Sequence, residues 1–578
     1  MISKKKRLLA ATVGGGLTLA ALLAGPLEAH PASSELVGVG HAQPKDPLVP
    51  VGTPASHPGY TSGNHLAAGL FETPVAQGSD RLENPTPPVP FYGYDGDGPM
   101  VPLAGDVQTT THNVEATKTE PDKNTYLRLK GQHGADPDYN YGTHFLFQGH
   151  EGGSPGYITR VNLDADGEHR ITLMATADTN GTALPTIDGS TWDPFAHRLL
   201  FTGEHGTSAA NQQAGKPTDQ RGGVWQSTLD VPATVQDLSG AFGRGGFEGI
   251  QNDSAGNVWF VEDTGGTTGT GPYVKAKQPN SFVYRFVPTH VGDLTAGKLE
   301  VLQVLSNRTH GPITFHPGNI NGDISSTDTR DLHNYGGGFD TNWVTVHDTS
   351  IDGTAAFDAN LAAKNHGGTP FKRPENGQFQ PGTRFRKFLF DETGDTDAAS
   401  GANGQFGGWG AIQQLTQSSP GSDHGRLRLF YKPDQAHTGL DNVAFLSKHE
   451  VVFVEDAGDT LHTQRNALDS GFVFDTNVDY SRPRALLPVR LLAEGRDASA
   501  TVDSSLGAAG NGFQNDADNE ITGMHVSNGD PGKGGVLGAQ DPTPLRTDRS
   551  DNDRWRVFYT QQHGDNFTWE ILKAPHQR

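Results

Sequence analysis

The chain has 578 residues, including 75 Gly, 37 Pro and no Cys, and its formal net charge is −22. The absence of cysteine excludes disulfides and thiolate metal sites, and the acidic charge argues against nucleic acid and anionic membrane surfaces as partners. A chain of this length can bury a large core, and bound calcium is a further source of rigidity where disulfides are absent.

The N-terminus has the pattern of a secretory signal peptide. Lys4–Arg7 form a charged start, residues 8–25 are apolar and small, and Ala29 offers a cleavage point. The charged start lacks paired arginines, which favours ordinary secretion over the twin-arginine route. We therefore expect residues 1–29 to be a signal peptide and the protein to be secreted, with an uncleaved anchor as the alternative. No later segment is apolar enough to span a bilayer.

The next segment, residues 30–125, is rich in Pro, Gly, Ser and His. This composition is typical of segments with little regular structure, so we expect an extended N-terminal arm that lies partly on the domain. Residues 528–553 are interpreted as a surface loop for the same reason. Over residues 126–578, Gly and Pro are scattered among apolar runs, as turns are, which favours a single all-β domain with loop insertions.

Six segments of this domain repeat one pattern. Residues 258–266 read VWFVEDTGG and residues 451–459 read VVFVEDAGD. Looser copies are FLFQGHEGG (145–153), LLFTGEHGT (199–207), KFLFDETGD (387–395) and RVFYTQQHGD (556–565). Each copy begins like a buried strand and ends in acidic residues or His before Gly, as a turn with polar ligands does.

The spacing of these copies indicates the architecture. Their anchor aromatics are Phe147, Phe201, Phe260, Phe390, Phe453 and Phe558. A blade of four strands needs roughly 40–50 residues, and the two longest intervals between anchors contain insertions. We therefore predict an all-β fold, a six-bladed β-propeller with an N-terminal arm. An array of β-sandwiches is the alternative.

Acidic and amide residues lie next to these strands. In a propeller the inner strands face a central channel, where side chains far apart in the sequence meet. Crowded carboxylates repel one another unless a hard cation lies among them, and calcium takes six to eight oxygen ligands. This favours a calcium site, with solvated turn positions as the alternative for each residue. The candidates are Glu248, Asn252, Asp253, Glu262, Asp263, Glu375, Asp441, Asn442, Glu455, Asp456, Asp459, Asp516, Asp518 and Glu520.

The stretch FKRPENGQF places Arg373 and Glu375 on either side of Pro374. Proline restricts the residue before it, so we expect Arg373 to be extended. A guanidinium beside a metal-bound carboxylate can hold two oxygens of a phosphate while the metal holds another. A surface Arg–Glu pair of little energetic value is the alternative.

His563 lies in YTQQHGDN, at the end of the last strong strand. A neutral imidazole can bind a metal or transfer a proton, and a structural His bonded to the main chain is an equal alternative. The same two interpretations apply to His150 and His205. The sequence contains no nucleophile elbow, phosphate-binding P-loop, H-E-x-x-H or dinucleotide fingerprint.

Several of these motifs, over residues 120–578, resemble the PhoX-type secreted alkaline phosphatases. FKRPENGQFQPG is similar to the R-P-E motif of that family, and LDNVAFLSKHEVVFVEDAG is similar to its next blade. DNEITGMHVSNGD followed by WRVFYTQQHGDN is similar to its closing segment, and LLFTGEHGT to the strand that carries a metal-bridging cysteine followed by glutamate. The resemblance implies a six-bladed propeller that hydrolyses phosphate monoesters and diesters with iron and calcium in its channel.

The resemblance also implies roles for individual residues. Arg373 would hold the phosphate and His563 would line the site, which with Glu375 gives the predicted catalytic set Arg373, Glu375 and His563. The predicted metal ligands are Glu204, Glu248, Glu375, Asp441, Asn442 and Glu520.

Two features depart from the family. Gly203, directly before Glu204, occupies the position that matches the bridging cysteine, and the leader lacks the twin-arginine pattern. The missing thiolate argues against Fe³⁺ and leaves Ca²⁺ as the expected cofactor. FEGI (247–250) also resembles phytase-like propellers that work with calcium alone.

The sequence therefore predicts a secreted calcium-dependent phosphoesterase that acts on a phosphate ester. Two alternatives stay open. One is a non-catalytic calcium-stabilised propeller that binds an extracellular glycan or protein. The other is a lactonase-like sugar hydrolase with a channel calcium.

Overall fold

The structure is a computed structural model that describes residues 49–50, 64–78, 80–93, 120–151, 156–204, 222–465, 467–493, 520–545, 555–562 and 566–573. The predicted signal peptide, residues 1–29, lies outside these ranges. In the described part of the chain, no helix is long and apolar enough to cross a membrane.

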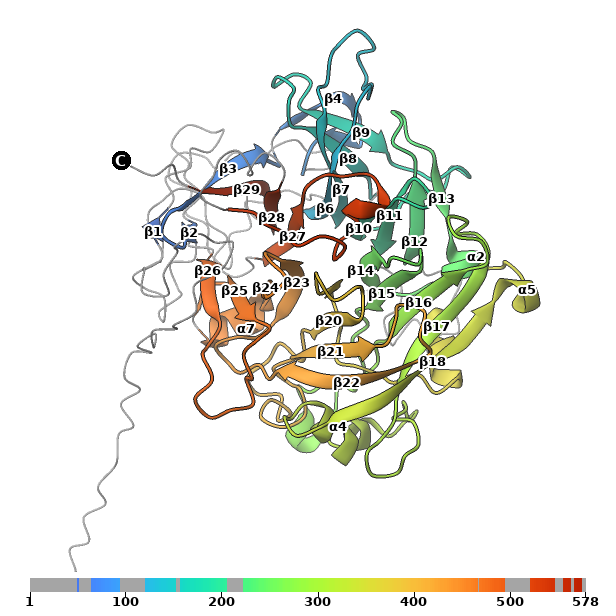
Figure 1. Cartoon of the computed structure of the whole chain (residues 1–578), viewed down its shortest axis with the longest axis vertical. Coiled ribbons are helices and arrows are strands. Elements are labelled where there is room, and N and C mark those ends of the chain that lie inside the picture. Colours follow the sequence, from blue (N-terminus) through green and yellow to red (C-terminus); the bar gives the residue numbers. More distant parts are fainter. Residues whose placement is uncertain are drawn as a thin grey trace, which may run out of the picture.

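The fold is all-β and propeller-like. Four sheets of four to six strands and one nine-stranded sheet surround a common centre, and a two-stranded sheet lies at the periphery (Figure 1). Neighbouring strands within each sheet are antiparallel. The sheets expose one end of each innermost strand to the same central space, so residues distant in the sequence meet there.

Three of the central sheets have four strands each. The first contains β6 (Glu120–Arg128), β7 (His144–Glu151), β8 (Ile158–Asn162) and β9 (Ile171–Ala175). The second contains β10 (Ile187–Asp193), β11 (Arg198–Gly203), β12 (Gly223–Ser227) and β13 (Val235–Asp237). The third contains β27 (Glu520–Ser527), β28 (Arg556–Gln562), β29 (Phe567–Lys573) and, from near the other end of the chain, β3 (Leu70–Ala76).

The other two central sheets are larger. One contains β23 (Leu440–Phe445), β24 (Glu450–Glu455), β25 (Ser470–Asp475) and β26 (Val489–Ala493), extended by β2 (His65–Leu66) and β1 (Val49–Pro50). The nine-stranded sheet contains β14 (Phe247–Asn252), β15 (Val258–Glu262), β16 (Val283–Pro288), β17 (Gly297–Val304), β18 (Gly338–Asp348), β19 (Gly377–Phe379), β20 (Lys387–Glu392), β21 (Ala411–Gln417) and β22 (His424–Tyr431). In this sheet β18 pairs with both β17 and β22.

The segment expected to be an extended arm contributes strands to these sheets. β3 completes the sheet of β27–β29, β2 pairs with β26, and β4 (Arg81–Thr86) pairs with β5 (Val89–Phe91). β6 begins at Glu120, before the domain boundary placed after residue 125. Because β3 hydrogen-bonds to β29, an early and a late segment of the chain close the arrangement together (Figure 1).

The helices are short and lie in loops. Four of the eight described helices belong to the insertion between β17 and β19, which accounts for one long interval between the sequence repeats. Asp358 caps α6 by accepting the N–H of Leu361, and Ser326 caps α4 in the same way through Thr329. The described helices are α2 (Ser239–Phe242), η2 (Gly271–Tyr273), α3 (Ile320–Ile324), α4 (Thr327–Leu332), α5 (Thr349–Asp352), α6 (Ala359–Asn365), α7 (Gly458–Arg465) and η3 (Lys533–Gly535).

The core lies between adjacent sheets, and the repeated aromatics occupy equivalent places in it. The six anchor residues are fully buried, each in the second strand of its sheet segment: Phe147 in β7, Phe201 in β11, Phe260 in β15, Phe390 in β20, Phe453 in β24 and Phe558 in β28. Burying one such side chain stabilises the fold by about 1.5–3 kcal/mol. The sequence repeat is therefore a packing repeat.

Candidate metal centre

The central carboxylates come from irregularities at the start of the innermost strands. β6, β10, β14 and β23 each shift register where Asp122, Asp188, Glu248 and Asp441, respectively, stand in the strand. A bulge of this kind leaves residues outside the regular ladder and re-aims their side chains. β27 has the same irregularity at Gly523, which has φ +59 and carries no side chain. The bulges thus turn one acidic residue of each of these four strands toward the centre.

The innermost strand β19 adds a fifth carboxylate by a different route. Glu375 lies two residues before β19, and its main-chain carbonyl accepts the N–H of Gly249 at 2.8 Å. This bond ties Glu375 to the bulge of β14, directly beside Glu248. The connection explains why two acidic residues that are far apart in the sequence lie together.

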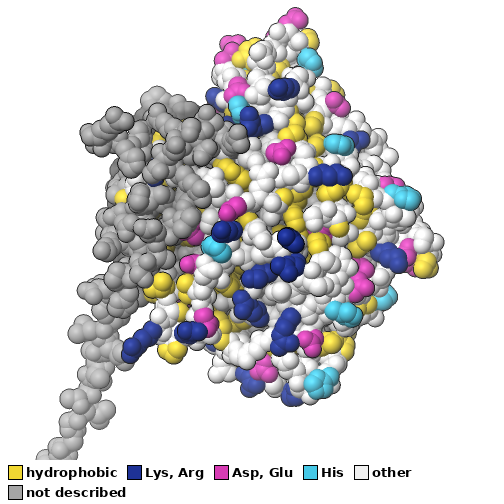
Figure 2. Space-filling model, viewed as in Figure 1, with side chains coloured by type: hydrophobic (Ala, Val, Ile, Leu, Met, Phe, Trp, Pro, Cys, Tyr) yellow, Lys and Arg dark blue, Asp and Glu magenta, His cyan; other side chains and the backbone are white. Residues whose placement is uncertain are grey.

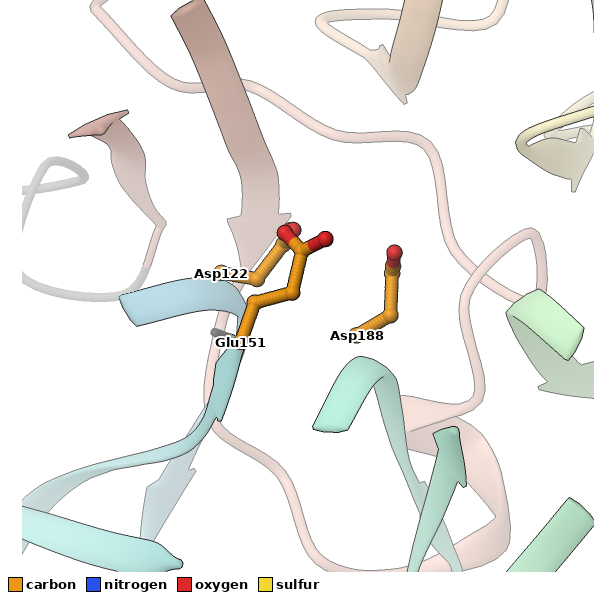
Figure 3. Close-up of side chains that lie close together, drawn as sticks. All are labelled: Asp122, Glu151 and Asp188. Carbon is orange, nitrogen blue, oxygen red and sulfur yellow. The ribbon is translucent and has the colours of Figure 1, made fainter. Parts of the chain in front are cut away.

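The carboxylates form three overlapping groups, and within each group the ligand oxygens lie within 4.8 Å of one another. Figure 3 shows the first group, in which the side chains from β6, β7 and β10 point toward one space. Because neighbouring groups share Asp188 and Glu248, the seven residues form one continuous arc. The groups are Asp122, Glu151 and Asp188; Asp188, Glu204 and Glu248; and Glu248, Glu375 and Asp441.

Burial and mutual repulsion make this arc costly without a cation. Desolvation, followed by the charges of neighbouring carboxylates, raises the pKa of Asp188, Glu248 and Asp441 well above the usual range. One oxygen of Asp441, Oδ2, is buried and accepts no hydrogen bond from a described residue. An orphaned oxygen inside an oxygen-only cluster fits a hard cation such as calcium.

Neutral donors close the arc on the side of β27. The hydroxyl of Thr522 donates to Asp122 Oδ1 at 2.6 Å and accepts Nδ2 of Asn442 at 2.9 Å. Gln562 Nε2 donates to both Asp122 Oδ2 and Glu151 Oε2 at 3.1 Å. This side therefore stabilises the existing carboxylates with hydrogen bonds and adds no acidic ligand to the three groups.

A lysine lies among these acidic residues. Lys123 is only 4% exposed, and its Nζ donates to Asn376 Oδ1 at 2.6 Å and to Asn442 Oδ1 at 3.1 Å. Burial lowers its pKa, against the charges of Asp441 and Asp122. Lys123 thus occupies the amide oxygen of Asn442, a residue that was predicted from the sequence to bind a metal.

Arg373 lies at the edge of the arc. Its Nε lies 2.9 and 3.0 Å from the two oxygens of Asp263, its Nη2 lies 2.7 Å from Asp263 Oδ2, and Nη2 also donates to Glu375 at 3.0 Å. Burial opposes its charge, but the carboxylates of Asp263 and Glu375 raise its pKa. The side chain is 17% exposed, which excludes the alternative of a surface pair.

The expected extended conformation of Arg373 is wrong, because its φ is +61. The main-chain carbonyl of Arg373 accepts the N–H of Thr393 at 2.8 Å, and its guanidinium bonds to the carboxylate of Asp263. A non-glycine residue in this region costs of order 1–3 kcal/mol, and surrounding contacts must hold it there. The strain therefore marks a position whose side-chain direction is imposed by the site.

A second cation, Lys277, lies beside Arg373. The charge of Arg373 lowers the pKa of Lys277, as does burial, while Asp263 and Asp395 oppose the shift. Its Nζ donates no hydrogen bond to a residue in the described part of the chain, whereas the neighbouring Lys372 is bound to both oxygens of Asp395 at 2.8 and 2.9 Å. Two adjacent cations at the border of a carboxylate cluster can bind an anion.

The structure brings together four of the predicted ligands, Glu204, Glu248, Glu375 and Asp441. Glu520 begins β27, pairs with Gln562 in the ladder and belongs to none of the three groups. His563, His205, Asp516 and Asp518 lie outside the described residues. His150 packs on the Tyr157 ring at 4.1 Å and bonds to Thr159 at 2.8 Å, so its contacts are structural.

Sequence reasoning missed Asp122, Lys123, Glu151, Asp188 and Lys277. Asp188 could have been found, because IDGS (187–190) repeats the acid–Gly pair of FEGI (247–250) at the start of a strand. Asp122 and Lys123 lie in the segment that was interpreted as an arm, where no inner strand was expected. Lys277 lies in a long loop without a periodic pattern.

The position expected to match the family's bridging thiolate is closed to a side chain. A Cβ built on Gly203 would lie 2.8 Å from the carbonyl oxygen of Thr186 and 3.1 Å from the Trp225 ring. A cysteine therefore does not fit at this point without a shift of the main chain. The oxygen ligands suit calcium, and the site offers no thiolate for iron.

Comparisons with known proteins do not place the chain in a family. No family model and no curated protein matches the sequence. A solved structure of a polysaccharide lyase of family PL25, an ulvan lyase, aligns over 79% of this chain and 95% of that chain, with 8% sequence identity and a TM-score of 0.30. A likeness at this level does not define an activity.

Proposed function

We propose that this protein is a secreted calcium-dependent phosphoesterase. The observation that carries the proposal is the joining of a buried carboxylate arc with two adjacent cations, Arg373 and Lys277, at one end of it. A phosphate ester presents oxygens that match both parts. Cations of the protein neutralise some of these oxygens, and a bound metal would neutralise others.

The proposal includes a six-bladed architecture. Its blades are β6–β9, β10–β13, β14–β17, β19–β22, β23–β26, and β27–β29 with β3, and β18 connects two of them into the nine-stranded sheet. In this arrangement each blade contributes its innermost strand to the channel. Five such strands supply a carboxylate, and the sixth supplies the hydroxyl of Thr522.

The residues of the chain have distinct roles in the proposed hydrolysis. The carboxylates of the arc would hold calcium, which polarises phosphate oxygens and water when bound. Arg373, oriented by Asp263, donates from its guanidinium to a phosphate oxygen, and Lys277 neutralises a second. A carboxylate of the arc that calcium leaves free would accept the proton of the attacking water. The new P–O bond replaces the ester P–O bond, and the alcohol leaves with a proton.

Phosphate release from a chromogenic monoester tests the proposal. We expect activity with added calcium, its loss in excess chelator, and a fall of at least a hundredfold in kcat/KM in Arg373→Ala, because a charge-assisted phosphate contact is lost. Lys298→Ala is the matched control, since Lys298 is 55% exposed on β17 and belongs to no part of the arc. Activity that survives both chelator and Arg373→Ala would contradict the assignment.

The two alternatives give different results with the same samples. A lactonase-like hydrolase would open lactones and release no phosphate. Asn442 argues against a calcium site built from Glu, Asn and Asp, because its amide oxygen already accepts Lys123. A binding propeller would bind calcium, detected by metal analysis and by a rise in Tm, and hydrolyse neither substrate.

A further inference from the structure

A basic groove lies on the sheet face formed by β20, β21 and β22, outside the central arc. It has a volume of about 830 Å³. Figure 2 shows Lys and Arg side chains gathered over these strands, although the whole chain has a formal charge of −22. The cations lining it are Lys387 on β20 and Arg426 and Arg428 on β22. A concentration of positive charge on an acidic protein indicates a local partner of opposite charge.

These cations are only partly satisfied by the protein. Lys387 Nζ bonds to no residue in the described part of the chain. Arg428 donates through Nε to Gln414 at 2.9 Å, and its terminal amino groups have no partner among the described residues. Arg426 is 62% exposed and pairs with Asp340, which is 74% exposed, so water screens that ion pair. Burial, with the charges of Arg428 and Arg386, lowers the pKa of Lys387. The groove therefore contains cations that repel one another, and their N–H groups are available as hydrogen-bond donors to a ligand.

The sheet register sets the spacing of the charges. Lys387 pairs with Thr416, and Thr416 pairs with Arg426, so a neutral residue separates the two cations by two strand spacings, about 10 Å. Arg426 and Arg428 lie two residues apart on one strand, about 7 Å. Cations anchored at these separations line the groove over a length of about 10 Å. They match negative groups distributed along an extended ligand.

The rest of the groove offers neutral hydrogen-bonding groups, aromatic rings and one carboxylate, Asp479, which pairs with Arg482 at 2.9 Å. Thr416, Gln414, Asn477 and Ser481 supply hydroxyls and amides, and the rings of Tyr335, Phe430 and Tyr480 line the same space. Hydroxyl-rich sugars need such partners, and aromatic faces bind their apolar sides. Nucleic-acid binding relies on more phosphate contacts than three cations provide, typically 6–10 in DNA-binding proteins. The lining therefore favours a saccharide.

We propose that this groove binds an acidic polysaccharide, a sugar chain with carboxylate or sulfate groups, independently of the channel. The ligand lies across β20–β22 with its negative groups on Lys387, Arg426 and Arg428 and its hydroxyl groups on the neutral lining. The groove adds a binding function to the proposed hydrolase. The proposal of polysaccharide binding does not depend on the hydrolytic activity.

Binding of the full chain to polygalacturonate and dextran sulfate tests the proposal, with neutral dextran and a single-stranded DNA oligonucleotide as comparison ligands. We expect saturable binding to at least one acidic polysaccharide that weakens with salt, and no binding to dextran. The double variant Lys387→Gln/Arg428→Gln should bind at least tenfold more weakly. The matched control Lys298→Gln/Arg330→Gln removes the same charge from exposed positions outside the groove and should bind like the wild type.

Three results would overturn the proposal: no binding to either acidic polysaccharide, equal weakening in the control double variant, or tighter binding of DNA than of both polysaccharides. Phosphate release is measured in the same preparations. The groove variants should keep wild-type kcat/KM on a small monoester, because none of the substituted residues belongs to the arc. Loss of docking and loss of hydrolysis are therefore separate outcomes.

Discussion

The segments 258–266 and 451–459 have nearly the same sequence and the same place in the fold, yet they are stabilised differently. Each forms the second strand of its sheet segment, and the main chain of Glu262 pairs with Phe247 as that of Glu455 pairs with Leu440. Both glutamates are fully buried. The repeated motif therefore reports a common position beside the bulge of the innermost strand.

The partners of the two glutamates differ. Glu455 accepts two hydrogen bonds from the guanidinium of Arg465, each at 3.0 Å, and Arg465 also bonds to Asp469 at 2.6 Å. Glu262 accepts hydrogen bonds from Asn360 at 3.0 Å and Tyr284 at 3.1 Å, both neutral. Similar sequences thus lead to an ion pair in one sheet and to hydrogen bonds with neutral groups in the other, because Arg465 and Asn360 come from helices, α7 and α6, that are not repeated.

The largest expected effect comes from removing the cation in the second copy. Arg465→Leu leaves Glu455 and Asp469 buried without their partner, so we expect the free energy of unfolding to fall by about 3–5 kcal/mol. Denaturant unfolding measures this change. Asn360→Ala, the matched variant in the first copy, removes one neutral donor and should cost about 1–2 kcal/mol. Equal losses would show that the two networks do not differ in charge.

The two copies should also differ in pH dependence. Burial raises the pKa of Glu262 to about 8, from 4.5. Between these values the folded chain holds a proton that the unfolded chain has released. Protonated Glu262 therefore contributes fully to the free energy of unfolding below pH 4.5. This contribution is lost as pH rises from 4.5 through 8, by at most about 1.4 kcal/mol per pH unit.

Tm measured from pH 5 to pH 9 tests this sign. Glu262→Gln removes the titrating group, so we expect the variant to lose less stability than the wild type as pH rises. Burial also raises the pKa of Glu455, against the charge of Arg465. Glu455→Gln weakens the pairing with Arg465, so it should lower Tm across this range and flatten its slope less than Glu262→Gln does. A wild-type slope in Glu262→Gln would disprove the assigned pKa shift.

Much of the radial plan could be predicted from the sequence, because packing repeats leave a periodic signal. Phe260 and Phe453 occupy equivalent buried positions, as their spacing suggested. The contribution of β3 to the last sheet could not be predicted, because its pairing with β29 joins distant segments and it lies within a segment rich in Pro, Gly, Ser and His. The connection between β17 and β22 could not be predicted either, because it depends on one long strand, β18, that pairs with β17 on one edge and with β22 on the other.

The site was predictable where an acidic residue stands before a recognisable strand. Glu248, Glu375 and Asp441 belong to this class and lie in one group. Glu262 and Asp263 are adjacent, and the sequence could not show which of them reaches the site. Adjacent residues point to opposite sides, so Glu262 stays inside its sheet and Asp263 binds Arg373. Lys123 was not predictable, since its role depends on amide oxygens from two other sheets.

The smallest expected effect separates the second acidic residues of the two copies. Asp263 holds Arg373 through both carboxylate oxygens, whereas Asp456 accepts the N–H of Gly458 at 2.9 Å, at the start of α7. Asp263→Asn keeps one acceptor but loses the charge and the fork, so Arg373 is less well oriented. We expect KM for a phosphate monoester to rise about tenfold, or about 1.4 kcal/mol, with kcat nearly unchanged.

Asp456→Asn is the matched control for this positioning role. It changes the equivalent residue of the motif, and the main-chain bond at Gly458 can form to the amide oxygen. The charge of Asp456 also acts on Arg373, so KM should rise in this variant too, but by less than in Asp263→Asn. Steady-state kinetics of both variants at saturating calcium measure the difference. Equal changes in KM would mean that Asp263 contributes only general negative charge, and a fall confined to kcat would place it in the chemical step. A larger rise in KM in Asp263→Asn would instead tie the unusual backbone of Arg373 to the binding of phosphate.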